Sequence, residues 1–317
     1  MLPDSSPALY CAAPMEPVTS PPDQSKMAAA AWVLAASLAF SLLYASGKLT
    51  GGLLPALQIV FIRYLSGFAT VSGIAAYQRL TPARALGTGR RWLHLLRACC
   101  GVFGGGCSIY GATHMPLADA SALALLQGLF VMLLAVLLLG ERLRRAQIVA
   151  ALVCLAGAFV IVRGNAPNGT FGGGSFANLL DHGIAPLAAI LGALLTACEI
   201  ILIKYLTRHE TMLSMLLHVN GFAVLLLLPA MLWLWTDADW ATLGALCLLG
   251  PMAILGQMCN VRAYRLADAA WLAPFGYSSV AFGALIGWIA FRDLPGAATW
   301  AGAGLIIGGC LLLVRRG

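Results

Sequence analysis

The chain is built of long apolar runs that are separated by short polar stretches. About 20 apolar residues in helical conformation cross a hydrocarbon core of about 30 Å. The runs are continuously apolar and do not alternate with polar residues, so they predict helices and not the strands of a membrane barrel. By this rule we expect ten transmembrane helices, over 28–47, 55–77, 92–113, 118–139, 146–163, 184–206, 211–235, 241–264, 268–291 and 296–314.

The second half of the chain repeats the first half in altered form. The tetrad Leu-Ala-Asp-Ala at 117–120 returns at 266–269, and each copy opens a long apolar run. These runs end near Glu141 and Asp293, and each of these acids is followed by an arginine 22 positions later. A membrane protein of two related halves is most often a carrier, with its substrate site where the halves meet.

The Gly/Asn-rich stretch 165–183 separates five predicted helices from five others. An odd number of helices in each half makes the halves insert in opposite orientations. We therefore predict an all-α integral membrane protein of ten transmembrane helices, arranged as two inverted five-helix repeats. Its expected parts are a disordered N-terminal tail at 1–26, a first repeat at 27–164, a periplasmic linker at 165–183 and a second repeat at 184–317. The tail lacks the apolar core of a signal peptide, and Met27 is an alternative start.

Composition excludes a water-soluble globular protein. Hydrophobic residues make up 61% of the chain and charged residues 10%, against about 25% charged residues in soluble domains. The net charge is +7, but the basic residues fall between the apolar runs, so they indicate topology and not a nucleic-acid partner. With a cytoplasmic N-terminus, 14 of the 19 Lys and Arg residues lie on the cytoplasmic side, and only Lys48, Arg163 and Arg292 lie outside. We therefore expect both termini in the cytoplasm.

Neither a metal site nor an enzyme is indicated. None of the nine cysteines has the spacing of metal ligands, so we expect no metal and no cofactor. Four histidines, at 94, 114, 182 and 209, are dispersed over several loops and both membrane faces. A Walker-type phosphate loop does not occur in the sequence, which argues against ATP hydrolysis by this chain.

Two sets of residues carry a family likeness. Met-Pro-Leu-Ala-Asp-Ala at 115–120 with Leu-Gly-Glu-Arg at 139–142 resembles the first repeat of the EamA transporters of the drug/metabolite transporter superfamily. Ala-Pro-Phe-Gly-Tyr at 273–277, with Gly-Trp at 287–288 and Leu-Pro at 294–295, resembles the second repeat.

The likeness covers about 27–314, nearly the whole chain, and implies a carrier in the bacterial inner membrane, usually an exporter of metabolites or toxic compounds. The chain departs from the family at Gly128, where the first repeat commonly has proline, and at Asp293, where the second repeat would carry glutamate. The first departure puts a proline-specific gating role in doubt.

Charged side chains inside a predicted span are costly, so each is either satisfied or functional. Glu199 lies near the middle of its span, where it suits a proton-coupled carrier or forms an ion pair with Arg63 or Arg97. Arg63 and His218 stand as counterparts in the two halves, and His218 is the one histidine that we place inside the membrane. Glu199 and His218 are the candidates for proton coupling, whereas Arg97 is expected to anchor to lipid headgroups.

Further polar and aromatic residues suit a cavity for a polar solute, although some will instead join helices to one another. The predicted substrate-binding residues are Tyr44, Arg63, Tyr110, Gln127, Glu199, His218, Gln257, Asn260, Tyr264, Trp271, Tyr277 and Ser278. Asp119 and Asp268 are predicted as helix caps, since each begins an apolar helix. For Glu141 we expect a local salt bridge with the arginines that follow it.

The sequence thus predicts an exporter of a small polar or zwitterionic metabolite, amino-acid-like or metallophore-like. Import of a nucleoside-like or vitamin-like metabolite is the alternative, and a membrane-embedded enzyme is a remote one. The expected partners are the small-molecule substrate and membrane lipids. A homodimer through the outer helices 146–163 and 296–314 is also open.

Overall fold

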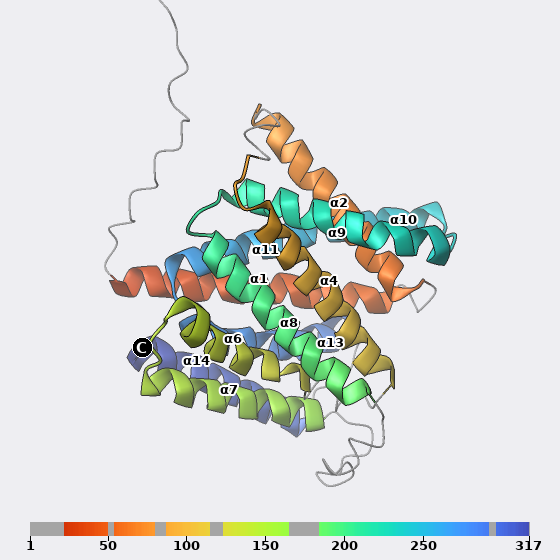
Figure 1. The fold of residues 1–317 in the computed structure, drawn as a ribbon. Coiled ribbons are helices and arrows are strands. Elements are labelled where there is room, and N and C mark those ends of the chain that lie inside the picture. The colour runs from red at the N-terminus through yellow and green to blue at the C-terminus, as the bar shows by residue number, and fades with distance from the viewer. Residues whose placement is uncertain are drawn as a thin grey trace, which may run out of the picture.

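The computed structural model describes residues 22–49, 54–79, 87–114, 123–164, 184–291 and 296–316, and within these ranges all regular structure is helical (Figure 1). The helices are α1 (Pro22–Leu49), α2 (Ala56–Tyr77), α4 (Arg91–His114), α6 (Leu126–Leu139), α7 (Arg145–Gly164), α8 (Ala185–Leu206), α9 (Met212–Leu234), α10 (Trp240–Cys247), α11 (Leu249–Leu266), α12 (Ala269–Gly276), α13 (Ser278–Phe291) and α14 (Ala297–Arg316).

Seven stretches of the described chain are long and apolar enough to cross a membrane, and α6 and α7 add two shorter apolar segments. The chain is therefore a multi-pass membrane protein. Two predicted spans are interrupted, because α10 gives way to α11 at Leu248 and α12 gives way to α13 at Tyr277. The first interruption has a local cause, since Pro251 lacks the N–H group that would bond the carbonyl of Cys247.

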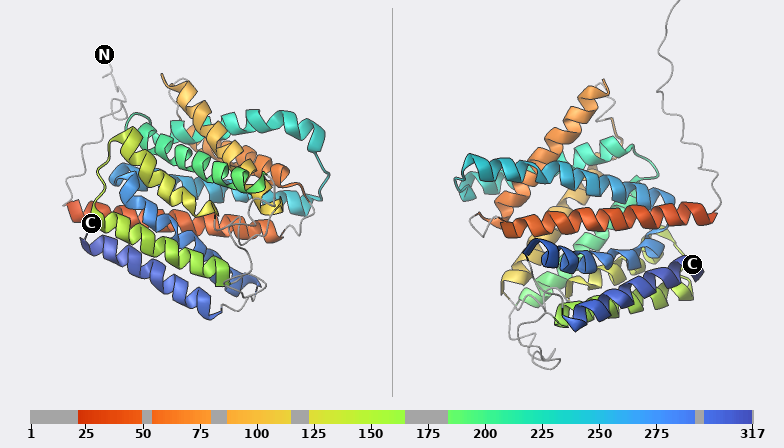
Figure 2. Two further views of the ribbon diagram at one scale, coloured as in Figure 1. Left: turned by 60° about the horizontal axis from the view of Figure 1, so that its bottom comes forward. Right: turned by 180° about the vertical axis from the view of Figure 1, so that it is seen from behind.

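α1 runs through the middle of the bundle, with α2, α9 and α11 on one side and α13, α7 and α14 on the other (Figure 2). The most extensive packing joins α7 to α14, α4 to α8, α1 to α11 and α2 to α9. Large apolar side chains such as Leu137, Trp233 and Ile289 are exposed on the outside of the bundle. In a bilayer these side chains face lipid, so the apolar exterior needs no further cover.

Glycine allows the closest helix contacts. A Cβ atom on Gly157 of α7 would lie 2.6 Å from the carbonyl oxygen of Gly302 on α14, and a Cβ on Gly302 would likewise collide with the carbonyl of Gly157. Between α4 and α8, a Cβ on Gly192 would lie 2.6 Å from the hydroxyl of Ser108. The backbones of these pairs therefore approach at distances that only glycine permits, as is common where helices pack within a membrane.

Several contacts tie helix ends together at one end of the bundle. Arg265, in the last turn of α11, donates to the carbonyl of Glu210 before α9 at 2.8 Å. The guanidinium of Arg90 lies 5.9 Å from the ring centre of Tyr205 on α8, and that of Arg262 lies 4.7 Å from the ring of Trp32 on α1. We call this the basic end of the bundle; α8 and α11 end there and α9 and α12 begin there.

Alanine in place of Gly302 is expected to destabilise the protein, because neither the Gly157 backbone nor Ile161 can yield enough room. Overpacking of this kind costs about 1–3 kcal/mol, so the melting temperature in detergent should fall by several degrees. Gly304 is the matched control on the same helix, since nothing lies within 4 Å of a Cβ there. Equal melting temperatures for Gly302→Ala and Gly304→Ala would contradict the α7–α14 packing.

Candidate functional site

A buried ion pair joins α4 to α8. Arg97 is fully buried, and its Nε lies 3.6 Å from Oε1 of Glu199, whose side chain is 19% exposed. Nη1 of Arg97 donates to the carbonyl of Met215 on α9 at 3.4 Å. A Cβ on Gly101 would lie 3.0 Å from Glu199 Oε2, so glycine leaves room for the carboxylate beside α4. The expectation that Arg97 anchors to lipid headgroups is wrong, because the guanidinium points into the bundle and finds its counter-ion there.

Arg63 is a second guanidinium within the predicted spans. It is half-buried on α2, and its Cζ lies 4.3 Å from the ring centre of Tyr64. Nε of Arg63 is buried and has no hydrogen-bond partner in the described part of the chain. Glu199 thus has one direct guanidinium partner, Arg97, and Arg63 is a further half-buried positive group whose Nε is not hydrogen-bonded in the described structure.

Two histidines stack beside this ion pair. His94 is fully buried in the first turn of α4, and its ring centre lies 4.6 Å from that of His218 on α9, with 17° between the ring planes. His218 bonds through Nδ1 to the carbonyl of Ser214 at 2.8 Å. The sequence analysis counted His94 among the loop histidines although its predicted span 92–113 includes this residue; the structure places His94 in α4, which begins at Arg91.

A small cavity of about 130 Å³ lies between α6 and the α12–α13 pair. Three of the predicted binding residues, Gln127, Tyr264 and Tyr277, line it together with Gly128 and apolar side chains. The hydroxyl of Tyr277 donates to the carbonyl of Leu125 at 3.0 Å. A Cβ on Gly128 would lie 2.5 Å from that hydroxyl oxygen, so the glycine that replaces the family's proline makes room for Tyr277.

The other predicted binding residues lie outside this lining. Gln257, Trp271 and Ser278 are buried, and each has a polar atom without a hydrogen-bond partner within the described ranges. Asn260 is half-buried on α11, whereas Tyr110 is 37% exposed and its ring stacks on His114. Tyr44 belongs to α1, but its side chain lies outside the described residues.

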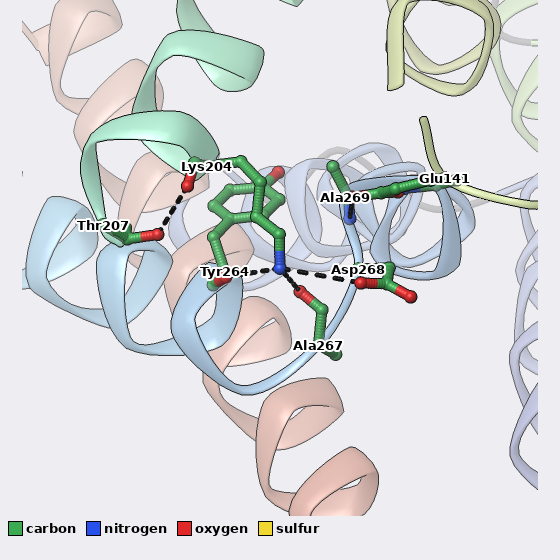
Figure 3. A network of polar contacts seen from close by, with 8 residues as sticks. Glu141, Lys204, Thr207, Tyr264, Ala267, Asp268 and Ala269 are labelled. Atoms are coloured by element: carbon green, nitrogen blue, oxygen red, sulfur yellow. Dashed lines mark hydrogen bonds and ion pairs between the residues drawn. The ribbon is translucent and has the colours of Figure 1, made fainter. Parts of the chain in front are cut away.

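Sequence reasoning missed a charged cluster at the basic end (Figure 3). Lys204, buried at the end of α8, donates to the carbonyls of Tyr264 at 2.9 Å and Ala267 at 2.5 Å, and its Nζ lies 3.8 Å from Asp268. Glu141, which follows α6, accepts from the backbone N–H groups of Ala269 and Ala270. The missed signal was that Lys204 lies inside a predicted span, where a charge needs partners.

Two sequence predictions change as a result. Glu141 caps α12 from across the bundle, so the expected local salt bridge with its neighbouring arginines is wrong. Asp268 holds the N-cap position of α12 but makes no capping hydrogen bond, because its carboxylate turns toward Lys204 instead. Asp119, the other predicted cap, lies outside the described residues.

Among the residues that the structure describes, no group of three or more His, Cys, Asp or Glu side chains could hold a metal ion. The cysteine pair between α7 and α14 is close, with 4.0 Å between the sulfur atoms of Cys154 and Cys310, and both are free thiols.

The chain is similar to known proteins over most of its length. The sequence profile of the EamA-like transporter family matches residues 27–163 and 183–315. A pseudopaline exporter of Pseudomonas aeruginosa (strain UCBPP-PA14), CntI, is 30% identical over 290 residues, covering 88% of this chain and 93% of the exporter. A riboflavin transporter of Brucella anthropi is 31% identical, covering 86% of this chain and 91% of its own.

A more distant relative and a solved structure extend the comparison. An S-adenosylmethionine uptake transporter of Rickettsia prowazekii is 25% identical, with 89% of this chain and 91% of that protein covered. A solved crystal structure of another protein superposes on this chain with a TM-score of 0.73 at 21% sequence identity. The superposition covers 92% of this chain and 98% of the chain in that structure. At that identity the superposition establishes the shared fold alone.

Removal of Arg97 is expected to destabilise the protein more than removal of the whole ion pair. Arg97→Met leaves Glu199 without its closest counter-ion, and breaking a buried pair costs about 3–5 kcal/mol. Arg97→Met/Glu199→Gln removes both charges and should recover a large part of that loss. Thermal unfolding of the single and double variants in detergent measures the coupling; strictly additive losses would show that the two side chains do not interact.

Proposed function

The chain belongs to the EamA-like transporter family, and we propose that it exports a small zwitterionic or anionic metabolite across the bacterial inner membrane by alternating access. It is a transporter of small molecules and not an enzyme. The substrate class, the direction and the mechanism are our proposal, and each rests on a different observation.

The single observation that carries the substrate class is the combination of one carboxylate with two guanidinium groups. Glu199 is partly exposed and is paired with the buried Arg97, and the half-buried Arg63 has an Nε without a hydrogen-bond partner in the described structure. An amino group of the substrate would replace an arginine as the partner of Glu199, while a carboxylate would pair with Arg63. The uncharged polar lining of Gln127, Tyr264 and Tyr277 would then hold the rest of the molecule.

Alternating access is supported by the size of the cavity. A volume of about 130 Å³ is below the roughly 300–1,000 Å³ of most ligand pockets. A metabolite of ordinary size therefore needs the walls on α6 and α12–α13 to separate before it enters or leaves. Such a motion of one part of the bundle against the other is how carriers expose a fixed site to each side in turn.

The inverted duplication, with repeats at 27–164 and 184–317, is supported by helix packing. Under this assignment α1, α2 and α4 correspond to α8, α9 and the α10–α11 pair. The packing of α1 on α11 is then the counterpart of the packing of α4 on α8, and α2 on α9 is its own counterpart. The proposed topology places the basic end, with both termini, in the cytoplasm, because Lys and Arg collect there.

Import is the second candidate direction. The names of relatives include an exporter and an uptake transporter, at 30% and 25% identity, so family membership does not favour one of them decisively. The riboflavin and S-adenosylmethionine transporters support a nucleoside-like or vitamin-like solute for the import alternative. Proton exchange at Glu199 or His218 and a homodimer through α7 and α14 remain part of the proposal.

Purified protein in proteoliposomes loaded with a mixed metabolite pool tests this proposal. We expect a pH gradient to drive the movement of a defined solute, and we expect Glu199→Gln to abolish gradient-driven movement because it removes the anionic partner of the substrate's amino group and the proton site together. The solute is identified by mass spectrometry of the external medium, and accumulation in intact cells gives the direction. Normal transport by Glu199→Gln, with unchanged pH dependence, would contradict both roles of this residue.

A further inference from the structure

At the junction between α11 and α12, one helix ends and the next begins at a place that is buried in the bundle. α11 ends at Leu266, α12 begins at Ala269, and both Ala269 and Ala270 are essentially fully buried. A helix end leaves carbonyl groups or N–H groups without partners, and a buried end without such partners is unstable. At this junction the carbonyls of one helix end and the N–H groups of the next helix start meet within three residues.

Two ions from other segments satisfy the two ends separately. The Lys204 ammonium donates to the carbonyls of Tyr264 and Ala267 at the end of α11, and the Glu141 carboxylate accepts from Ala269 at 3.0 Å and from Ala270 at 2.8 Å (Figure 3). The positive group lies at the negative end of one helix dipole, and the negative group lies at the positive end of the other. The charge of each ion is therefore opposite in sign to the helix end that it contacts.

The junction also forms part of the cavity wall. The ring of Tyr264 lines the cavity while its carbonyl accepts from Lys204, and Leu272, one turn into α12, lines it too. On the facing wall, α6 contributes Gln127, Gly128 and Val131. Glu141 follows the end of α6, so its bonds to α12 tie the two walls together at the basic end.

From this geometry we propose that Glu141 and Lys204 are positioning residues for transport, and that release of Glu141 from the start of α12 is the step that opens the cavity at the basic end. The inference rests on the proposed carrier function. Lys204 stays bonded to the end of α11 during this step, because both of its carbonyl partners belong to that helix end. Glu141 follows α6 and accepts hydrogen bonds from the start of α12, so these bonds must break when the two walls separate.

Asp268 offers a matched control. Its side chain is 65% exposed and lies 3.8 Å from Lys204, so water replaces this contact readily. If the cluster acted as an ordinary ion-pair network, loss of Asp268 and loss of Glu141 would have comparable effects. If transport instead requires the bonds to the helix ends, loss of Glu141 or Lys204 impairs it and loss of Asp268 does not.

The first experiment measures hydrogen–deuterium exchange of peptides that cover the α11–α12 junction, in full-length protein reconstituted in lipid. We expect Glu141→Gln to raise exchange at Ala269 and Ala270 at least ~10-fold, as loss of charge-assisted hydrogen bonds implies, and Asp268→Asn to leave it within about twofold. Exchange that rises over the whole chain, or equally in both variants, would overturn the positioning role.

The second experiment follows the same peptides in wild-type protein during turnover. Addition of the transported pool should raise exchange at Ala269 and Ala270 and leave the α7–α14 contact unchanged. Exchange at the junction that stays constant while solute moves would overturn the gating step. A failure to move any solute would instead contradict the proposed function, and the static exchange result for Glu141→Gln would be unaffected by it.

A charge exchange separates helix-end pairing from a simple salt bridge. Glu141→Lys/Lys204→Glu keeps an opposite pair but places each ion at the wrong helix end. We expect transport by this double variant to stay at least ~10-fold below wild type, because both dipole contacts are now repulsive. Recovery to near wild-type transport would show that mutual attraction alone is required and would overturn the inference.

Discussion

The structure depends on satisfying backbone groups that are buried where water does not reach. An unpartnered N–H or carbonyl group that is buried away from water costs several kcal/mol, so the connection between two helices can be buried only if something replaces the missing bonds. At the α11–α12 junction Glu141 and Lys204 make four hydrogen bonds to the exposed ends. Bonds to charged groups contribute about 1.5–3 kcal/mol each, which makes this junction a strongly held point of the described bundle.

The α11–α12 junction in turn sets the position of the cavity. Because α12 is short and begins at a capped end, its residues Leu272 and Ala273 face α6 and leave a space that Tyr264 and Tyr277 border. The charged groups sit apart from this lining, on the interface of α4 with α8, where Gly101 admits the carboxylate of Glu199. In the proposed mechanism, the charged groups that bind the solute therefore lie on α4 and α8, whereas the walls that move apart lie on α6 and the α12–α13 pair.

The continuous apolar runs correctly predicted an all-helical membrane protein. Three of the predicted binding residues, Gln127, Tyr264 and Tyr277, line one cavity of the described structure, and their role in binding stays a prediction. Sequence reasoning failed where partners come from distant segments. Glu141 was assigned to its arginine neighbours because sequence shows only local charges, whereas its actual partners are the N–H groups of Ala269 and Ala270. Hydropathy placed the start of the helix that carries His94 correctly, but it does not show which side chains of distant helices meet, so the stacking of His94 on His218 could not be foreseen.

The burial of Arg97 is hard to explain by stability alone. A buried ion pair often gives no more stability than apolar side chains of similar volume, because desolvation offsets the attraction between the charges. Arg97 has a single hydrogen bond of 3.4 Å and two further nitrogen atoms without hydrogen-bond partners in the described structure, while the side chain of Glu199 is 19% exposed. A loosely bonded guanidinium beside a partly exposed carboxylate costs stability. Under the proposed function this cost has a reason, because a carboxylate with a weakly held counter-ion can exchange that counter-ion for a charged group of the solute.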